Sequence, residues 1–246
     1  MEKARQMIVF VALAVLVGCT PPEESLIKKN NLNLSSESSG SLGQGSSQGY
    51  SRNSSIDPAT RNILESYGST IKGYSKTYGF DWRLILAVMK QESKFAEAAQ
   101  SHKGASGLMQ IMPTTSEEVG RVLAIEDMSH PMNNIRGGIY YLRKLYDLFE
   151  GAEESDRIRL TLAAYNAGIG RVYDAQELAA YFHDNPSEWQ SVKDALPLLS
   201  KRYYTLHKNV WNQEKPRAGW FGNSRQTVTY VDKVMEYYDD YRTSLN

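Results

Sequence analysis

The stretch that decides the fold begins at Gln91-Glu92-Ser93 and continues, after a short run and Ser101, as Gly104-Ala105-Ser106-Gly107-Leu108-Met109-Gln110-Ile111-Met112-Pro113. Before it, four aliphatic residues recur at spacings of three and four, which predicts an amphipathic helix: Leu84, Ile85, Val88 and Met89. Glu92 takes the next step of that stripe, where a charged side chain is uncommon. If it is buried there, its carboxyl has a raised pKa and can serve as a general acid. The alternative is that the apolar face ends at Met89 and Glu92 is a solvated residue of the last turn.

The segment after this helix combines glycines with a short apolar run. Gly104 and Gly107 allow the backbone to turn tightly and to approach a ligand closely. The apolar run from Leu108 to Ile111 contains one amide, Gln110. An acid at a helix end that faces such a turn is the arrangement that a sugar-binding cleft needs.

Composition excludes several classes of function. The chain has 246 residues, which favours one or two domains, and its 28 Lys and Arg balance its 28 Asp and Glu. No stretch is strongly basic, so no nucleic-acid partner is predicted. The four histidines lack the spacing of metal ligands, so neither a metal nor a cofactor is expected: His102, His130, His183 and His207. We expect a monomer.

The N-terminus reads as a processing signal. Lys3 and Arg5 precede an apolar run, residues 8–17, that is too short for a permanent membrane anchor. The sequence Leu16-Val17-Gly18-Cys19 resembles a bacterial lipobox, which implies a signal peptide of residues 1–18 and a lipid on Cys19. By the same resemblance, Thr20 favours an outer-membrane anchor that faces the periplasm. The alternative is an ordinary secretory peptide, in which this cysteine, the single one of the chain, is incidental.

The remaining chain divides into a tether and a helical domain. Residues 19–56 are rich in Ser, Gly, Asn and Gln and predict a flexible tether. Residues 57–246 predict a mainly α domain of roughly eight helices, with at most a small β-hairpin at residues 104–111. Helix starts are expected at typical capping residues: Asp57, Asp81, Thr114 (paired with Glu117), Asn133-Asn134, Asp156 and Asn185-Pro186-Ser187.

Three motifs, in this order, resemble the family 1 lytic transglycosylases of bacterial cell walls: Glu92-Ser93, Gly107-Leu108-Met109-Gln110 and Ala164-Tyr165-Asn166-Ala167-Gly168. Residues 189–204 are similar to the catalytic module of the F-type membrane-bound enzymes. The resemblance covers residues 63–238 and implies an α+β, lysozyme-like catalytic domain. It does not extend to the solute-binding domain of the F-type enzymes, because the chain has only the tether in that place.

The resemblance assigns roles to particular residues. Glu92 matches the catalytic acid and base. The positions that match residues near the glycan, and are therefore expected to bind substrate, are Ser93, Ser101, Gly107, Met109, Gln110, Tyr165, Asn166, Gln226 and Tyr230. On pattern alone, Tyr165 is a core aromatic with one hydrogen bond. The motif that starts at Gln226 often starts with glutamate in the family, so a second cleft carboxylate is missing from that site.

A single carboxylate suggests an unusual glycosidase. Ordinary glycosidases use two carboxylates, whereas Glu97, Glu117, Glu118 and Asp127 lie near capping or solvated positions. The resemblance implies a carbon–oxygen lyase that cleaves peptidoglycan strands between N-acetylmuramic acid and N-acetylglucosamine. The muramyl C6 hydroxyl takes the place of water and closes a 1,6-anhydro ring, a step that gains from proximity. Two alternatives remain: a hydrolytic muramidase on the same fold, and a non-catalytic glycan-binding lipoprotein.

Overall fold

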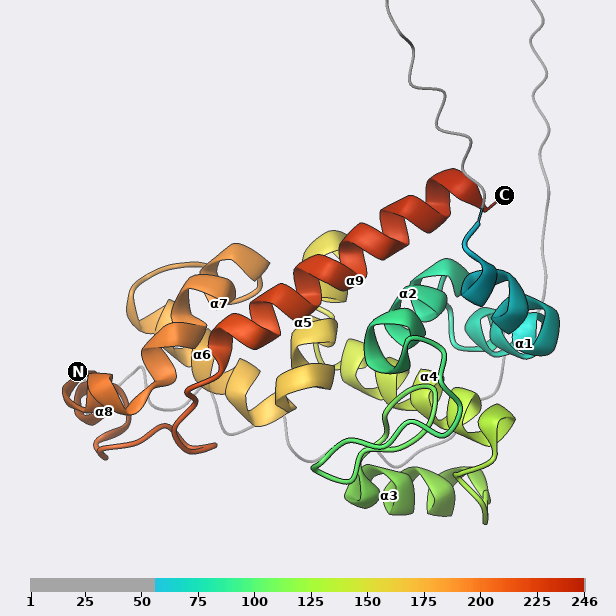
Figure 1. The fold of residues 1–246 in the computed structure, drawn as a ribbon. Helices are drawn as coiled ribbons and strands as arrows, with labels where there is room; N and C mark the ends of the chain where they lie inside the picture. The colour runs from blue at the N-terminus through green and yellow to red at the C-terminus, as the bar shows by residue number, and fades with distance from the viewer. Residues whose placement is uncertain (1–55, 246) are drawn as a thin grey trace, which may run out of the picture. The chain divides into compact units, whose positions relative to one another are not determined.

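Helices supply nearly all the regular structure of residues 56–245, which are the residues that the computed structural model describes. Over that range the chain forms nine α-helices, two short 3-10 helices and no extended strand (Figure 1). The predicted mainly helical class is therefore confirmed. The predicted signal peptide, Cys19 and nearly all of the predicted tether lie outside the described residues.

The helices follow one another closely along the chain. The α-helices are α1 (Pro58–Thr77), α2 (Trp82–Ser93), α3 (Pro113–Leu123), α4 (Pro131–Asp147), α5 (Glu154–Ala167), α6 (Ile169–Tyr181), α7 (Trp189–Ala195), α8 (Tyr204–Trp211) and α9 (Ser224–Ser244). The 3-10 helices η1 (Leu196–Leu199) and η2 (Lys201–Tyr203) lie between α7 and α8. None of the helices within residues 56–245 has the length and apolar character needed to cross a bilayer.

The helices form two groups that α9 joins. Helices α1 to α4 pack together on one side, and α6 to α8 pack with η1 on the other (Figure 1). Helix α5 contacts both α4 and α6, and the long α9 packs along α2 and α5 (Figure 1). Because α9 contacts both α2 and α5, side chains at the ends of these two helices can meet side chains of α9 at one place.

Helix α2 lies at the centre of the core. The predicted stripe is confirmed, since Leu84, Ile85, Val88 and Met89 are all buried. Burial extends to Leu86 and Ala87, because α1 and α9 both pack against this helix. A helix that is apolar on nearly all sides is typical of a core position. The polar residues at its C-terminal end are therefore placed by a rigid, buried element.

Two of the predicted helix caps are confirmed. The Asp57 carboxylate accepts a hydrogen bond from the Thr60 amide at 2.9 Å, and the Asp81 carboxylate accepts one from the Arg83 amide at 3.0 Å. Each satisfies an amide that the first turn of a helix leaves without a partner.

At the predicted start of residues 113–117 the helix is confirmed but its cap is wrong, and the start predicted at Asn133-Asn134 is wrong by a few residues. The capping box of Thr114 and Glu117 does not form, because α3 already begins at Pro113. Similarly α4 begins at Pro131, so Asn133 and Asn134 lie inside it. Proline favours the first helical position, because its φ is fixed near the helical value and it lacks an amide proton.

Two further starts are displaced for other reasons. Helix α5 begins at Glu154, which places Asp156 in the first turn rather than at the cap, where its charge still suits the helix dipole. Helix α7 begins only at Trp189, because the Asn185 side chain accepts a hydrogen bond from the Ser187 amide at 3.0 Å and forms a turn instead.

The predicted hairpin is reduced to two isolated bridges. Ser106 pairs with Ile111, exchanging backbone hydrogen bonds of 3.1 and 3.0 Å, and also bridges to Gln100. Residues 101–111, which lie in the chain between α2 and α3, therefore form a compact turn, called the glycine turn below. It packs against α4 and the end of α5 through the contacts described next.

Candidate active site

Glu92 lies in the last turn of α2 and is only partly accessible to solvent. The Tyr230 hydroxyl, from α9, donates a hydrogen bond of 2.6 Å to Glu92 Oε1. Burial raises the pKa of the Glu92 carboxyl from 4.5 to about 7, although the hydrogen bond from Tyr230 acts to lower it. A carboxyl with this pKa is partly protonated at neutral pH. The structure thus supports the interpretation of Glu92 as a general acid over its interpretation as a solvated residue of the last turn.

The glycine turn requires glycine at position 107. Gly107 has a φ of +77°, and a Cβ atom there would lie 2.5 Å from Asn134 Cγ. The side chain of Gln110 also holds the turn, because its Nε2 donates hydrogen bonds of 2.9 Å to the carbonyl oxygens of Ala99 and Gly107. The side-chain amide of Gln110 therefore has a fixed orientation, with its oxygen free of these two bonds.

Ser93 fastens α2 to this turn. Its buried hydroxyl, which has a single proton to donate, lies within hydrogen-bond distance of two carbonyl oxygens, that of Met89 at 3.2 Å and that of Leu108 at 3.0 Å. It also accepts a hydrogen bond from the Phe95 amide at 3.1 Å. Because Ser93 follows Glu92 directly, these bonds fix the distance between the acid and the turn.

Asn134, in α4, also holds the glycine turn, although its place in the sequence indicated only a helix start. It is buried in α4, where its Oδ1 accepts from the Met109 amide at 2.8 Å and its Nδ2 donates to the Ser106 carbonyl at 3.1 Å. An asparagine beside Ile135 on the apolar face of a helix was the signal that could have revealed it. Buried amides need such partners.

The end of α5 joins the turn to α9. The Tyr165 hydroxyl donates to the Met109 carbonyl at 2.7 Å, and burial, followed by the nearby Glu92, raises the Tyr165 pKa well above its usual value. The neighbouring Asn166 accepts a hydrogen bond of 2.9 Å from the Thr227 hydroxyl on α9. Gly168, with a φ of +89°, ends the helix immediately afterwards. Tyr165 is thus held by a hydrogen bond to the glycine turn, and Asn166 is held by a hydrogen bond to α9.

Glu92 lies where two hollows meet. The first has a volume of about 430 Å³ and is bounded by the glycine turn, the end of α5 and the loop before α9. The second, of about 590 Å³, lies along the first turns of α9. Both are lined by Glu92, Asn166 and Gln226. Together they are called the cleft below. An acid at such a junction can reach a bond between two units of a chain that occupies both hollows.

Most of the predicted site residues come together in this cleft. Those that line one hollow or both are Glu92, Ser101, Gln110, Tyr165, Asn166, Gln226 and Tyr230. Ser93, Gly107 and Met109 line neither hollow. The side chains of Ser93 and Met109 are buried, and all three shape the turn through the contacts described above.

Part of the cleft wall was not predicted from the sequence. The loop between α8 and α9 contributes the exposed Trp220 and the buried Phe221, and Lys103 and Arg171 line the same first hollow. The aromatic residues of that loop were the available signal, but nothing in their spacing indicated which side they would face.

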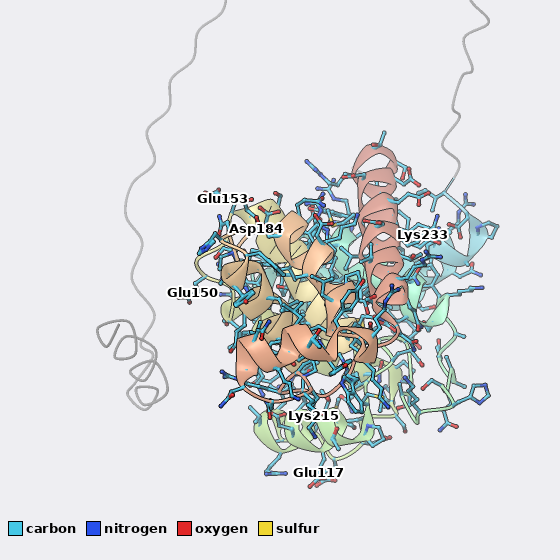
Figure 2. All side chains as sticks on the ribbon, turned by 90° about the vertical axis from the view of Figure 1, so that its left-hand side faces the viewer. Glu117, Glu150, Glu153, Asp184, Lys215 and Lys233 are labelled. Atoms are coloured by element: carbon cyan, nitrogen blue, oxygen red, sulfur yellow. The ribbon has the colours of Figure 1, made fainter. Side chains whose placement is uncertain are left out.

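Glu92 is the one carboxylate, among residues 56–245, that lines the cleft. The other acidic residues considered above have structural partners: Glu97 with Tyr67, Glu117 with Arg121, Glu118 with Lys144 and Asp127 with Ser129. Figure 2 shows Glu117, Glu150, Glu153 and Asp184 at the periphery of the molecule. No group of His, Cys, Asp and Glu within the described range could hold a metal ion.

The class of protein follows from a comparison with known families. Residues 69–187 match the family described as Transglycosylase SLT domain, so the chain carries a domain of that family, as its three motifs predicted. It is similar to membrane-bound lytic murein transglycosylase F of Desulfosudis oleivorans, with 36% identity over 177 residues, covering 72% of this chain and 36% of that protein. The same-named protein of Shewanella pealeana is 37% identical over 182 residues, covering 74% of this chain and 35% of that protein. The chain thus spans about a third of the length of these relatives.

Solved structures give the same class. The 70 kDa soluble lytic transglycosylase SLT70 of Escherichia coli is similar with a TM-score of 0.50 and 25% identity, covering 72% of this chain and 24% of that one. An inactive mutant of lytic transglycosylase Slt from Pseudomonas aeruginosa is similar with a TM-score of 0.51 and 25% identity, covering 77% and 28%. The fold is therefore the mainly helical, lysozyme-like fold of these transglycosylases.

Proposed function

We propose that this protein is a peptidoglycan lytic transglycosylase, which cleaves the β-1,4 bond between N-acetylmuramic acid and N-acetylglucosamine without adding water. The observation that carries the proposal is a single partly buried glutamate at the junction of two hollows, with no second carboxylate lining them within residues 56–245. The names of the relatives support it. In the Pseudomonas protein, the variant described as inactive has one glutamate replaced by glutamine.

The chemistry needs only Glu92. In its protonated form it donates a proton to the glycosidic oxygen, and the bond from that oxygen to the muramyl C1 breaks. The resulting carboxylate, which the Tyr230 hydroxyl stabilises through its hydrogen bond of 2.6 Å, then takes the proton of the muramyl C6 hydroxyl. The C6 oxygen bonds to C1 and closes the anhydro ring. Glu92 is protonated again and no water is consumed. A pKa of about 7 suits both transfers.

The rest of the cleft holds the glycan. In this proposal Ser101, Gln110, Asn166 and Gln226 offer hydroxyl and amide groups to the sugars. Ser93, Gly107 and Met109 act through the backbone of the glycine turn. A hydrolytic muramidase is less well supported, because a water nucleophile needs a carboxylate base, and at position 226 the cleft wall carries an amide.

Purified peptidoglycan tests the proposal. Wild-type protein is expected to release soluble products that end in 1,6-anhydro-muramic acid. Glu92→Gln should release none while it still sediments with the polymer. Glu117→Gln is the matched control, because its side chain is 79% exposed, pairs with Arg121 and lies outside the cleft. Full activity of Glu92→Gln would exclude Glu92 as the acid, and the absence of any soluble product from wild type would favour the glycan-binding lipoprotein.

The cell envelope is the proposed location. The relatives are named as membrane-bound, and the lipobox resemblance implies a lipid on Cys19, which lies outside the described residues. We propose an outer-membrane anchor that lets a monomeric domain reach glycan strands in the periplasm. Cys19→Ser should move the protein from the membrane fraction to the soluble fraction. If it remains with the outer membrane, the lipid is not the anchor.

A further inference from the structure

The first hollow of the cleft carries two cationic side chains on different walls. Lys103 belongs to the glycine turn and Arg171 to α6, and both line the hollow beside Glu92. Neither forms a salt bridge with any of residues 56–245. The two unpaired charges therefore face a space that a ligand would occupy.

The guanidinium of Arg171 is held in place by other residues of the same hollow. Its Nη1 donates a hydrogen bond of 2.6 Å to the Ala167 carbonyl, and its central carbon lies 4.9 Å from the centroid of the Phe221 ring. Its Nε is buried and has no hydrogen-bond partner among the described residues. An arginine carries five N–H donors, and a held guanidinium loses little entropy when it binds a carboxylate. Spare donors on a fixed arginine indicate an anionic ligand.

Glu92 does not neutralise these cations. Its pKa is raised by burial and lowered only by the Tyr230 hydrogen bond, with no contribution from a nearby positive charge. In the form that starts the reaction its carboxyl is neutral. The hollow is therefore positively charged when the glycan enters.

We propose that Lys103 and Arg171 form a carboxylate subsite, which binds the negatively charged substituent of a muramic acid residue. This inference rests on the proposed function, because it assumes that peptidoglycan is the substrate. Muramic acid carries a lactyl ether on C3, which ends in a carboxylate when it is bare and is extended by a peptide with carboxylates of its own when it is substituted. N-acetylglucosamine carries neither group. The subsite would thus distinguish peptidoglycan from neutral amino-sugar polymers.

Binding to the Glu92→Gln protein tests this without turnover. Three ligands of equal length are compared by calorimetric titration: a glycan with peptide stems, the same glycan stripped by an amidase so that it carries lactyl carboxylates, and a neutral N-acetylglucosamine oligomer. In that background, Arg171→Gln and Lys103→Gln should each weaken binding of a carboxylate-bearing glycan about fivefold or more. Binding of the neutral oligomer should stay unchanged. Weaker binding of the stripped glycan identifies the lactyl carboxylate as the ligand of the subsite. Weaker binding of the stem-bearing glycan alone identifies a carboxylate of the peptide as the ligand.

Two controls separate charge from packing. Arg171→Lys keeps the charge and should keep most of the preference for carboxylate-bearing glycans. Arg61→Gln, on the exposed part of α1 and outside the cleft, should change nothing. Equal losses with all three ligands, or no loss with either anionic glycan, would overturn the subsite. The proposed activity is judged separately by the products of the wild-type protein, so either idea can fail while the other stands.

Discussion

Replacing Glu92 with glutamine should make the stability of the protein less dependent on pH. The Glu92 carboxyl has a pKa of about 7 in the folded protein against an ordinary 4.5. Between these two values the folded state retains a proton that the unfolded state has lost. The stability that this proton contributes is fully present below pH 4.5 and is lost as the pH rises through about 7.

The size of the effect follows from the shift. Each pKa unit corresponds to about 1.36 kcal/mol, so ionised Glu92 lowers the free energy of unfolding by about 3 kcal/mol above pH 7. Glutamine is neutral at every pH and can still accept the hydrogen bond from Tyr230. The variant should therefore be more stable than wild type at pH 8 by about 3 kcal/mol, relative to the difference between them at pH 4.5.

Urea unfolding of both proteins at several pH values measures this difference. Comparing the two proteins at each pH cancels the titration of all other groups. Glu117→Gln, whose side chain is 79% exposed, should show no comparable change between low and high pH. A difference between Glu92→Gln and wild type that stays constant from pH 4.5 to 8 would refute the raised pKa.

Of three further predictions, two concern the surroundings of Glu92 and one concerns Asp174, a buried residue of α6 outside the cleft. Gly107→Ala should lower the free energy of unfolding by about 2 to 4 kcal/mol, because the new Cβ would lie 2.5 Å from Asn134; thermal unfolding measures this, and an unchanged midpoint would contradict it. Tyr230→Phe removes a hydrogen bond that lowers the Glu92 pKa, so the alkaline limb of the rate profile should move to higher pH, and a move to lower pH would contradict this. Asp174→Ala leaves the Ala218 amide without its acceptor at 2.8 Å and should cost about 2 kcal/mol of stability in chemical denaturation, with a loss below about 0.5 kcal/mol contradicting the role.

Periodicity predicted the buried elements best. The spacing of the aliphatic residues before Glu92 predicted α2, and the deviation of Glu92 from that pattern made it a candidate acid, to which the motif resemblance then assigned the catalytic role. The caps at Asp57 and Asp81 were also correct, because each aspartate accepts a bond from a nearby amide of its own helix. Where a proline preceded the polar residue, as at Pro113 and Pro131, the helix began earlier than the cap pattern indicated.

Contacts between distant segments were the part that the sequence could not supply. Asn134 reaches the glycine turn only because α4 packs against that turn in the folded chain. Arg171 enters the cleft because Ala167 and Phe221 hold its guanidinium. The motif resemblance identified Tyr230, but its hydrogen bond to Glu92 depends on how α9 crosses α2. Each of these depends on the packing of helices that are far apart in sequence.

The mass of the product tests the central claim most directly. Purified sacculi are digested in water enriched in heavy oxygen, and the soluble muropeptides are identified by mass spectrometry. If Glu92 is the single acid and the muramyl C6 hydroxyl is the nucleophile, the products have 1,6-anhydro ends. These products are lighter than hydrolytic products by one water and contain no heavy oxygen. Reducing ends that have taken up heavy oxygen would show that water is the nucleophile, and would contradict the account of Glu92 as the one carboxyl group of the reaction.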